Sequence, residues 1–329
     1  MTVHSIGATG RDYATIALWE AACPANLVTS VDTWEGELYN DSEFVITTGI
    51  VIAGMTTDAT HNVQLRCATG QSFKSSGAVA LNYSQSNGVG IRTTTGELLM
   101  LQISASFTTL NGLQLHHNTT GYVCQCLKID NAVTDCVVSQ CIFRGGGNNS
   151  NRAAMWIGTG ANNKLTNCLI IAQRTADIAI HLDSAPSTTI LTNLTIVKPS
   201  NVTAGGTAVT FNYASSVWKG CAVFGFTTNK GGGGTPNAAS DYNATDLSSI
   251  TGSHSLTSKT YANQFQDSTN DWRVKTGADL HSAAIQFTET GDVDIKGQAR
   301  SVTTPDIGAW ETQSASGGFL NRNFWWGNY

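Results

Sequence analysis

The sequence predicts an all-β protein, folded as a single-stranded right-handed parallel β-helix of about 25–29 residues per coil, with a short N-terminal capping helix and an irregular C-terminal cap. Three observations predict this fold: a composition that suits strands, a segment that repeats at a fixed step, and a helical period near the N-terminus. Charged residues make up 12% of the 329 residues, about half the usual share. A surface of Ser, Thr, Asn and Gly suits exposed strands and turns better than long amphipathic helices.

A repeat occupies the middle of the chain. Four segments, VVSQCIF, KLTNCLII, ILTNLTIV and VWKGCAVF, share a column of small or apolar residues, formed by Cys141, Cys168, Leu194 and Cys221. These residues are 26 or 27 positions apart. The strands between them, AMWIG, IAIHLD and AVTFNY, share a second column, formed by Ile157, Leu182 and Phe211. Each unit therefore holds two short strands that bury their apolar face only when units stack.

The pattern extends on both sides of these coils. Upstream, LLMLQIS (98–104) and GLQLHHN (112–118) continue it, and EFVITTGIVIAG and NVQLRCA predict weaker coils before them. Long turns are expected at 144–152 and 230–240, and the period fades after residue 240. Stacked coils lie about 4.8 Å apart, the ordinary strand spacing. A β-sandwich also has short strands, but it does not account for a fixed step.

Both ends of such a solenoid need caps, because an open end exposes the core and an edge strand. In RDYATIALWEAAC (11–23) a helical period places four residues on one face, Tyr13, Ile16, Trp19 and Cys23. Asp12 stands where an N-cap residue would. We therefore expect an N-terminal cap over 1–30, a β-helix over 31–312 that includes a closing segment at 270–312, and an aromatic tail at 313–329.

The closing segment carries the most specific motif. It contains NDWRVKTGADLHSAA and then GDVDIKGQARSVTTPDIGAWE, and it resembles the last segment of many bacterial and phage β-helix proteins of the pectin-lyase-like superfamily. That segment typically has a D-F-R-L-x-x-G-S-P-A-like stretch, then D-x-D-G-x-x-R, then P-D-I-G-A-Y/W-E. The matching positions are Asp271, Trp272, Arg273, Gly277, Asp292, Asp294, Gly297, Arg300, Pro305, Asp306, Ile307, Gly308, Ala309, Trp310 and Glu311. The run ADLHSAA departs from the family pattern, and the stretches GRDYATIALWEAA, TWEGELYND and TTDATHNVQL are similar to the opening of such proteins.

The resemblance implies that this segment closes the last coil and is not a catalytic loop. Gly297 and Gly308 permit the tight turns that such a closure needs. Ile307 and Trp310 are then expected on the exposed end of the core. Arg300 has three acidic residues available for pairing, Asp294, Asp306 and Glu311. The same fold hosts lyases, hydrolases, adhesins and virion parts, so function must be argued from a site.

Charge and hydropathy argue against several functions. The net charge is −5 without a Lys/Arg cluster, which argues against a nucleic-acid partner. No stretch of about 18 apolar residues exists, so we expect no membrane span. The first residues, MTVHSIGATGRDY, have neither a basic n-region nor an apolar h-region. We therefore expect no secretory signal and synthesis in the cytosol.

The eight cysteines are predicted to be free thiols. None forms a CxxC pair, and in a long cytosolic chain buried thiols are commoner than disulfides. Four of them lie within 18 residues, Cys124, Cys126, Cys136 and Cys141. Their spacing, C-x-C-x9-C-x4-C, matches no common zinc motif, and Cys141 occupies a column in which Leu194 takes the same place. We therefore expect no metal and no cofactor.

A ligand site on a β-helix projects outward from neighbouring coils. In IAIHLD the inward positions are Ile178, Ile180 and Leu182, and the outward positions are Ala179, His181 and Asp183. The outward positions of nearby coils are Trp156 and Gly158, Thr210 and Asn212 and, past the 144–152 insertion, Gln114 and His116. The candidate glycan-binding residues are therefore Gln114, His116, Trp156, His181 and Asp183. In such a site the Trp156 indole stacks on a pyranose ring.

This face shows little catalytic machinery. Lyases of the resembled family need an Arg or Lys base and acidic residues that hold Ca²⁺, and glycosidases need carboxylates about 5–9 Å apart. The patch offers Asp183 and His181 as catalytic candidates, with Arg174 on a nearby turn. Other acidic residues, such as Asp130 and Asp135, are assigned to turns. The alternative is a sheet face that carries these groups without a ligand, so the sequence favours a non-enzymatic role.

The tail GGFLNRNFWWGNY is a candidate interface. Its anchors are Phe319, Leu320, Arg322, Phe324, Trp325, Trp326 and Tyr329. Aromatic side chains and an arginine are typical of interface hot spots. We expect the tail to dock on another subunit; the alternative is that it folds back on its own β-helix.

These features predict a structural virion protein of a bacteriophage, either a head decoration or a tail appendage, assembled in the host cytoplasm. The expected partners are other capsid or tail proteins, further copies of the chain in a homo-oligomer such as a trimer, and a cell-surface polysaccharide. Two alternatives stay open. One is a tailspike-like polysaccharide lyase or hydrolase that uses the face of Trp156, His181 and Asp183, and the other is a carbohydrate-binding adhesin.

Overall fold

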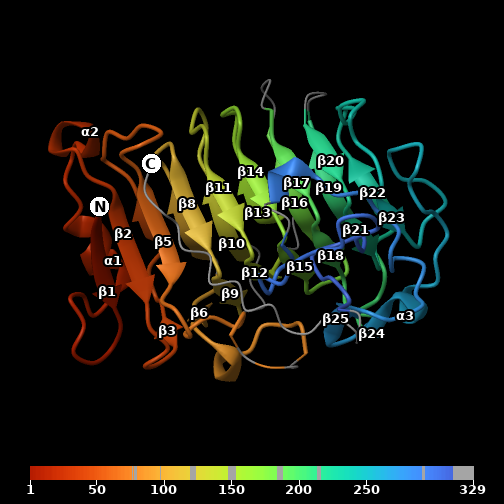
Figure 1. Cartoon of the computed structure of the whole chain (residues 1–329), viewed down its shortest axis with the longest axis horizontal. Coiled ribbons are helices and arrows are strands. Elements are labelled where there is room, and N and C mark those ends of the chain that lie inside the picture. Colours follow the sequence, from red (N-terminus) through yellow and green to blue (C-terminus); the bar gives the residue numbers. More distant parts are fainter. Residues whose placement is uncertain are drawn as a thin grey trace.

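The chain winds into a right-handed parallel β-helix, as the repeat predicts (Figure 1). The computed structural model describes residues 1–75, 77, 80–96, 98–118, 124–146, 153–183, 188–212, 216–290 and 293–313. Each full coil contributes one strand to each of three parallel sheets, which we number 1, 2 and 3. The inward side chains of the three sheets form one continuous main core along the axis.

The strands of each sheet lie in chain order along the axis. Sheet 1 holds β1 (Thr2–Ile6), β2 (Trp34–Leu38), β5 (Val63–Cys67), β8 (Thr108–Asn111), β11 (Val137–Ser139), β14 (Lys164–Thr166), β17 (Ile190–Thr192) and β20 (Val217–Lys219). Sheet 2 holds β3 (Phe44–Val45), β6 (Gly90–Thr93), β9 (Gln114–His117), β12 (Ile142–Gly145), β15 (Leu169–Ala172), β18 (Thr195–Val197), β21 (Ala222–Phe224) and β23 (Ala244–Thr245). Sheet 3 holds β4 (Ile50–Ile52), β7 (Leu98–Ile103), β10 (Cys124–Ile129), β13 (Ala153–Ile157), β16 (Ile178–Leu182), β19 (Thr207–Phe211) and β22 (Thr228–Gly231).

Among the described residues, a few short elements lie outside the three sheets. They are the helices α1 (Ile16–Ala21), α2 (Leu27–Ser30) and α3 (Tyr261–Gln264), the antiparallel pair β24 (Phe265–Asp267) and β25 (Asp271–Val274), and the 3₁₀ turns Gln85–Asn87 and Thr288–Thr290.

The strand register confirms both columns of the repeat. Ile157, Leu182 and Phe211 are direct partners in sheet 3. The residues of the other column, Cys141, Cys168, Leu194 and Cys221, directly precede β12, β15, β18 and β21, and all are buried. The described cysteines in it are free thiols. One detail differs: VVSQCIF is not one strand but two, β11 and β12, on either side of Gln140.

From β8 onward, a left-handed residue turns the chain at each corner between sheets 1 and 2. These residues stack coil upon coil with φ between 51° and 74°, and we call them the corner column: Gly112, Gln140, Asn167, Asn193, Gly220 and Tyr242. Glycine adopts this conformation freely, and asparagine adopts it more readily than most residues. Each N–H group of the first five donates to a carbonyl of the next coil, as Gln140 does to Thr166 O at 3.1 Å. The hydrogen-bond ladder therefore continues through the corners.

An apolar plug closes the N-terminal end. Ile16 and Trp19 of α1 are buried in the main core, together with Ile6 of β1. Trp34 Nε1 donates to Trp19 O at 3.3 Å. A Cβ on Gly36 would lie 2.7 Å from the Trp19 ring, so glycine is needed beneath the indole. This end is sealed by side-chain packing, as the helical period predicts.

The N-cap of α1 is Thr15 and not Asp12. Thr15 Oγ1 accepts a hydrogen bond from Leu18 N at 3.2 Å. Asp12 instead accepts from Ser5 N at 2.8 Å, and this bond lowers the pKa of Asp12. Tyr13 N donates to Ser5 O at 3.1 Å, so the chain runs along β1 up to that point. The helix therefore begins later than the sequence predicts.

Polar side chains close the C-terminal end. The inward positions of the last coil are Asn229, Lys230, Asn243 and Thr245, and they follow Ala208, Val209, Cys221 and Val223 of the coil before. Asn243 Oδ1 accepts from Cys221 N at 3.0 Å. Its Nδ2 donates to the carbonyls of Trp218 and Thr251 at 2.9 and 3.0 Å. The core columns thus change from apolar to hydrogen-bonded polar groups within one coil.

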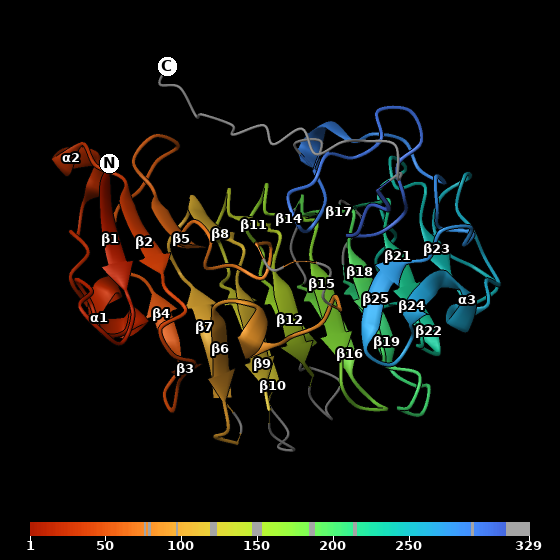
Figure 2. The same cartoon turned by 60° about the horizontal axis from the view of Figure 1, so that its bottom comes forward.

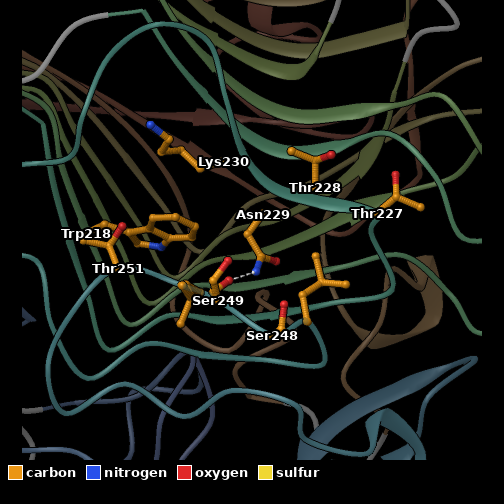
Figure 3. Close-up of a pocket in the computed structure, with 10 residues that line it drawn as sticks. Trp218, Thr227, Thr228, Asn229, Lys230, Ser248, Ser249 and Thr251 are labelled. Atoms are coloured by element: carbon orange, nitrogen blue, oxygen red, sulfur yellow. Dashed lines mark hydrogen bonds between the residues drawn. The ribbon is translucent and has the colours of Figure 1, made fainter.

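A cavity of about 510 Å³ lies at this end, between β22 and the loop 247–251 (Figure 3). Its lining consists of Trp218, Thr227, Thr228, Asn229, Lys230, Leu247, Ser248, Ser249, Ile250 and Thr251. Ile250 also packs against the main core. The loop therefore covers the core only in part.

The closing segment lies along the side of the β-helix and does not cap its end, contrary to the expectation (Figure 2). The outward residues of sheet 2 form a second hydrophobic core with it: Ile142, Leu169, Ile171, Val197, Ala222, Phe224 and Ala244. Trp272, Ile295 and Ile307 cover these residues, and Trp310 packs beside them. Sheet 2 is apolar on both sides, so its outer side also needs cover. Ile307 and Trp310 pack on that outer side and not on the end of the core, where the sequence placed them.

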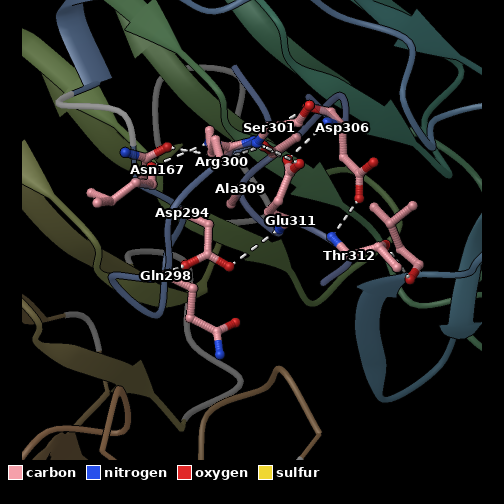
Figure 4. Close-up of polar contacts among 12 residues, drawn as sticks. Asn167, Asp294, Gln298, Arg300, Ser301, Asp306, Ala309, Glu311 and Thr312 are labelled. Atoms are coloured by element: carbon pink, nitrogen blue, oxygen red, sulfur yellow. Dashed lines mark hydrogen bonds and ion pairs between the residues drawn. The ribbon is translucent and has the colours of Figure 1, made fainter. Parts of the chain in front are cut away.

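Arg300 fastens this segment to the corner column (Figure 4). Its Nη2 donates to Gly308 O at 2.7 Å and to Asn167 Oδ1 at 3.2 Å. Its Nη1 lies 3.3 Å from Glu311 Oε2, which makes Glu311 the ion-pair partner among the three acidic residues named above. Burial raises the pKa of Asp294 to about 6, although Arg300 opposes the shift. The charged groups of the motif are thus engaged in holding the segment in place.

Candidate functional site

The outer face of sheet 3 holds the polar surface that the sequence singles out. Successive strands place one outward residue each directly beside the next, and we call this the outer row: Val51, Gln102, Lys128, Trp156, His181 and Thr210. The next residue along each strand, such as Ile157 or Leu182, points into the main core. The outer row therefore runs across the sheet as one ladder, with strand spacings of about 4.8 Å.

Trp156 and His181 form the centre of the outer row. Their rings stack with centroids 4.1 Å apart and an interplanar angle of 26°. Trp156 is half-buried, whereas His181 is 6% exposed. Burial lowers the pKa of His181 despite the nearby Asp183, so the imidazole is neutral at neutral pH. The indole thus rests on an uncharged ring that fixes its orientation.

Lys128 and Asp130 form an ion pair beside this stack. Lys128 Nζ lies 2.6 Å from Asp130 Oδ1, and Gln102 and Ser104 donate to Asp130 Oδ2. Burial raises the pKa of Asp130, but the hydrogen bonds from Lys128, Ser104 and Gln102 together outweigh it and hold the pKa below its usual range. The carboxylate is therefore ionised and fixed in position.

The strands of sheet 3 have a second outward position, two residues after the outer row. Two of the residues at this position are carboxylates, Asp130 and Asp183. Asp130 N donates to Ile103 O at 2.9 Å, Gly158 N to Ile129 O at 2.8 Å, and Asp183 N to Ile157 O at 2.9 Å. Asp130 therefore lies on the same face as Asp183, two coils away, at about 10 Å between backbones. Sequence reasoning placed Asp130 in a turn and missed Lys128. The signal was present, because Lys128 stands 28 residues before Trp156.

Gln114 and His116 do not belong to this face. They lie on β9 in sheet 2, beside β6 and β12. Gln114 is fully buried and binds the backbone of Ser84. His116 packs on the Tyr83 ring with centroids 4.7 Å apart, and burial lowers its pKa to about 4. Both residues hold the segment 81–89 against sheet 2, so the predicted patch of five residues is reduced to three.

The start of β16 also differs from the prediction. Ala179 is buried in the main core, and Ile178 lies outside that core. The ladder between β13 and β16 pairs Ala153 with Ile178 and Met155 with Ile180, and it skips the residues between them. The strict alternation expected for IAIHLD therefore holds only from Ile180 onward.

The site that results is a stacking surface flanked by polar groups. Asn212 Nδ2 lies 3.3 Å from His181 Nε2, next to Thr210 of the outer row. In the described part of the chain, no three His, Cys, Asp or Glu side chains gather as ligands of a metal would. No helix there is long and apolar enough to cross a bilayer. The tail anchors Phe319, Leu320, Arg322, Phe324, Trp325, Trp326 and Tyr329 lie outside the described residues.

Comparison with known proteins finds one distant structural likeness. No family model matches the sequence, and no curated protein matches it. Among solved structures, the chain is similar to that described as the crystal structure of pectate lyase Pel9A. The TM-score is 0.48 at 13% sequence identity, and the match covers 95% of this chain and 98% of that one. This likeness is one of architecture and does not bear on the activity of the chain.

Proposed function

We propose that this chain is a non-enzymatic virion protein of a bacteriophage, and that the part of the outer row from Gln102 to Thr210 binds a glycan of the host surface. The observation that carries the glycan part is the half-buried Trp156 indole, packed on neutral His181 on the outer face of sheet 3. A partly exposed indole provides apolar stacking area for the C–H face of a sugar ring. Its neighbours then decide which hydroxyl groups are recognised.

The polar groups around the indole suit this role. Lys128 and the ionised Asp130 lie on one side, and Asn212 and Thr210 lie on the other. The ion pair and the bonds from Gln102 fix Asp130 before any ligand arrives. Pre-organised donors and acceptors lower the ordering cost of binding. The face therefore favours an oligosaccharide that lies across the coils.

Binding to purified bacterial surface polysaccharides, measured by isothermal titration calorimetry, tests this proposal. Trp156→Ala removes the stacking surface, and we expect it to weaken binding by about tenfold or more, since an aromatic contact contributes about 1.5 kcal/mol. Val51→Ala is the matched control, because Val51 stands in the same outer row, three coils away, and is exposed. Equal losses in the two variants contradict the assignment of the site.

The virion part of the proposal is supported by the resemblance of the opening and closing segments to phage β-helix proteins. We extend it to a homo-oligomer, with a trimer as the expected state, bound to other capsid or tail proteins. Immunogold electron microscopy of particles, with antibody against the recombinant chain, tests it together with light scattering for the oligomer. Regular label on capsids or tails supports the proposal. Label restricted to cell envelopes contradicts it and favours the adhesin.

A polysaccharide lyase or hydrolase is the second candidate, and one observation favours it. Asp130 and Asp183 lie on the same face with the Trp156–His181 stack beside them. Carboxyl groups about 6.5–9.5 Å apart are the mark of inverting glycosidases. Release of reducing ends or unsaturated products from the bound polysaccharide tests this candidate. Turnover that Asp183→Asn abolishes makes the chain an enzyme and ends the non-enzymatic proposal.

A further inference from the structure

The three sheets end differently at the C-terminal end of the β-helix. In sheet 1 the last strand, β20, is continued by a bridge between Lys219 and Asp241. In sheet 2, β23 is continued by a bridge between Ala244 and Leu256. The last strand of sheet 3, β22, has no further bridge among the described residues. One of three edges therefore keeps the unpaired peptide groups that such a strand presents.

The cavity described above lies along this edge (Figure 3). Four consecutive residues at β22, 227–230, line it, and five consecutive residues, 247–251, form the opposite wall. Two of these residues, Asn229 and Lys230, are inward positions of the last coil, so the cavity lies at the end of the core, beside the edge of β22. A single hydrogen bond crosses it, from Asn229 Nδ2 to Ser249 O at 2.6 Å. The cavity is a slot beside a free edge.

We propose that this slot accepts an extended, acidic segment of another protein chain, which pairs with β22 as one further strand of sheet 3. An added strand makes main-chain hydrogen bonds with an open edge, and such bonds supply most of the affinity in this mode of recognition. Its backbone groups replace the Asn229–Ser249 bond. The inference is independent of the glycan site, which lies on the outer face of the same sheet.

Charge complementarity defines the chemistry of this partner. Lys230 is the only charged residue among the ten that line the slot. Its Nζ donates to Gly234 O at 2.7 Å, and an ammonium group has three donors, so two remain for a ligand. The hydroxyl groups of Thr228, Ser248 and Thr251 line the rest. An extended segment with small polar side chains and a carboxylate fits this lining.

Hydrogen exchange on the full chain tests the proposal with a synthetic peptide, acetyl-Thr-Asp-Thr-Asp-Thr-amide, at millimolar concentration. We expect the amides of β22 to exchange about tenfold more slowly with the peptide, since pairing closes the free edge. Amides of β20 serve as the internal control, because Asp241 already covers that edge. Ser249→Trp fills the slot and is expected to abolish the effect. Ser253→Trp lies in the same region outside the lining and is expected to retain it.

Two further peptides make the outcome decisive. Acetyl-Thr-Lys-Thr-Lys-Thr-amide tests the charge, and a peptide with proline in place of the central threonine tests main-chain pairing. Protection by the acidic peptide alone supports the proposal. Unchanged exchange at β22, or equal protection by all three peptides, overturns it. Protection by neutral oligosaccharides without protection by the acidic peptide overturns it as well and makes the slot a sugar site.

Discussion

The two ends of the β-helix are closed in opposite ways. At the N-terminal end, Trp19 and Ile16 insert into the main core and leave little space beneath them. At the C-terminal end the core columns turn polar, Asn243 binds three backbone groups, and a cavity of about 510 Å³ lies alongside. Apolar packing is non-directional and fills space, whereas a hydrogen-bonded end is directional and leaves gaps. The N-terminal end is therefore closed by packing, whereas the C-terminal end keeps a cavity beside the edge of β22.

The largest expected effect of a single substitution is at the N-terminal end. Trp19→Ala is expected to lower the free energy of unfolding by about 4 kcal/mol, because it removes a fully buried indole and leaves a cavity against Gly36. Leu18→Ala on the same helix is the control, since Leu18 is exposed. Urea unfolding followed by tryptophan fluorescence and circular dichroism measures both. If the two variants lose similar stability, this end does not depend on its plug.

At the C-terminal end, Asn243→Leu is expected to cost about 2 kcal/mol of unfolding free energy, because buried groups lose their hydrogen-bond partner. These groups are the Cys221 amide and the carbonyls of Trp218 and Thr251. The test is sharp, because a buried leucine, Leu194, already occupies the same column two coils earlier. Ser248→Ala at the exposed rim is the control, measured by the same urea titration. An Asn243→Leu variant as stable as the parent means that the polar end is dispensable.

A smaller effect is expected at the start of α1. Thr15→Ala removes the N-cap hydrogen bond to Leu18 N and is expected to cost about 1 kcal/mol of unfolding free energy. Thr9→Ala, a substitution of the same type at an exposed position nearby, is expected to be neutral. Thermal unfolding of the two variants in parallel measures the difference. A neutral Thr15→Ala contradicts the assignment of the cap.

The smallest expected effect is a pH dependence of opposite sign at the two ends. The hydrogen bond from Arg11 lowers the pKa of Asp41 at the N-terminal end, whereas burial raises the pKa of Asp246 at the C-terminal end. Asp41 therefore contributes stability above its unfolded pKa, and this contribution is lost as pH falls through the folded pKa. Asp246 contributes stability that is present below its unfolded pKa and is lost as pH rises through the folded pKa.

Hydrogen exchange between pH 3 and pH 7, corrected for intrinsic rates, separates these two contributions. Protection of β1 is expected to fall toward the acid limit, and protection of β23 is expected to rise in the same direction. Asp41→Asn and Asp246→Asn are expected to flatten the respective profiles. Parallel profiles at both ends contradict the contrast drawn between them.

The coil architecture and the plug were predictable from sequence because each follows from a period. The step that aligns Cys141 with Cys168 is the length of a coil, and the spacing of Ile16 and Trp19 is that of a helix. The closing segment forms a layer over the outer side of sheet 2, which we call the lateral cover. It was not predicted, although the sequence contains a signal for it. Runs such as CLII and CAVF are apolar at consecutive positions, which indicates a strand buried on both faces. Such a strand needs a second layer outside it.

The candidate site was predicted in part. Trp156, His181 and Asp183 do share one face. Gln114 and His116 were assigned to it because the repeat suggests two strands per coil, whereas each coil has three. The boundary between a strand of sheet 1 and the following strand of sheet 2 is not visible in the sequence. A single left-handed residue, such as Gln140 or Asn167, makes the turn within what looks like one strand. A two-strand unit merges sheets 1 and 2, so the extrapolation past the 144–152 insertion reached the wrong sheet.

The lateral cover also sets an order of events during biosynthesis. Residues 261–312 emerge from the ribosome after every coil that they cover, so the outer side of sheet 2 meets water until they arrive. In a partly synthesised β-helix, Ile171, Val197 and Phe224 are exposed to water. Such an intermediate binds chaperones or aggregates. A chain truncated before Tyr261 still contains every strand of the three parallel sheets but lacks the residues that cover sheet 2. The DIGAWE motif belongs to this late-emerging layer, and its loss is expected to appear as poor yield of soluble protein.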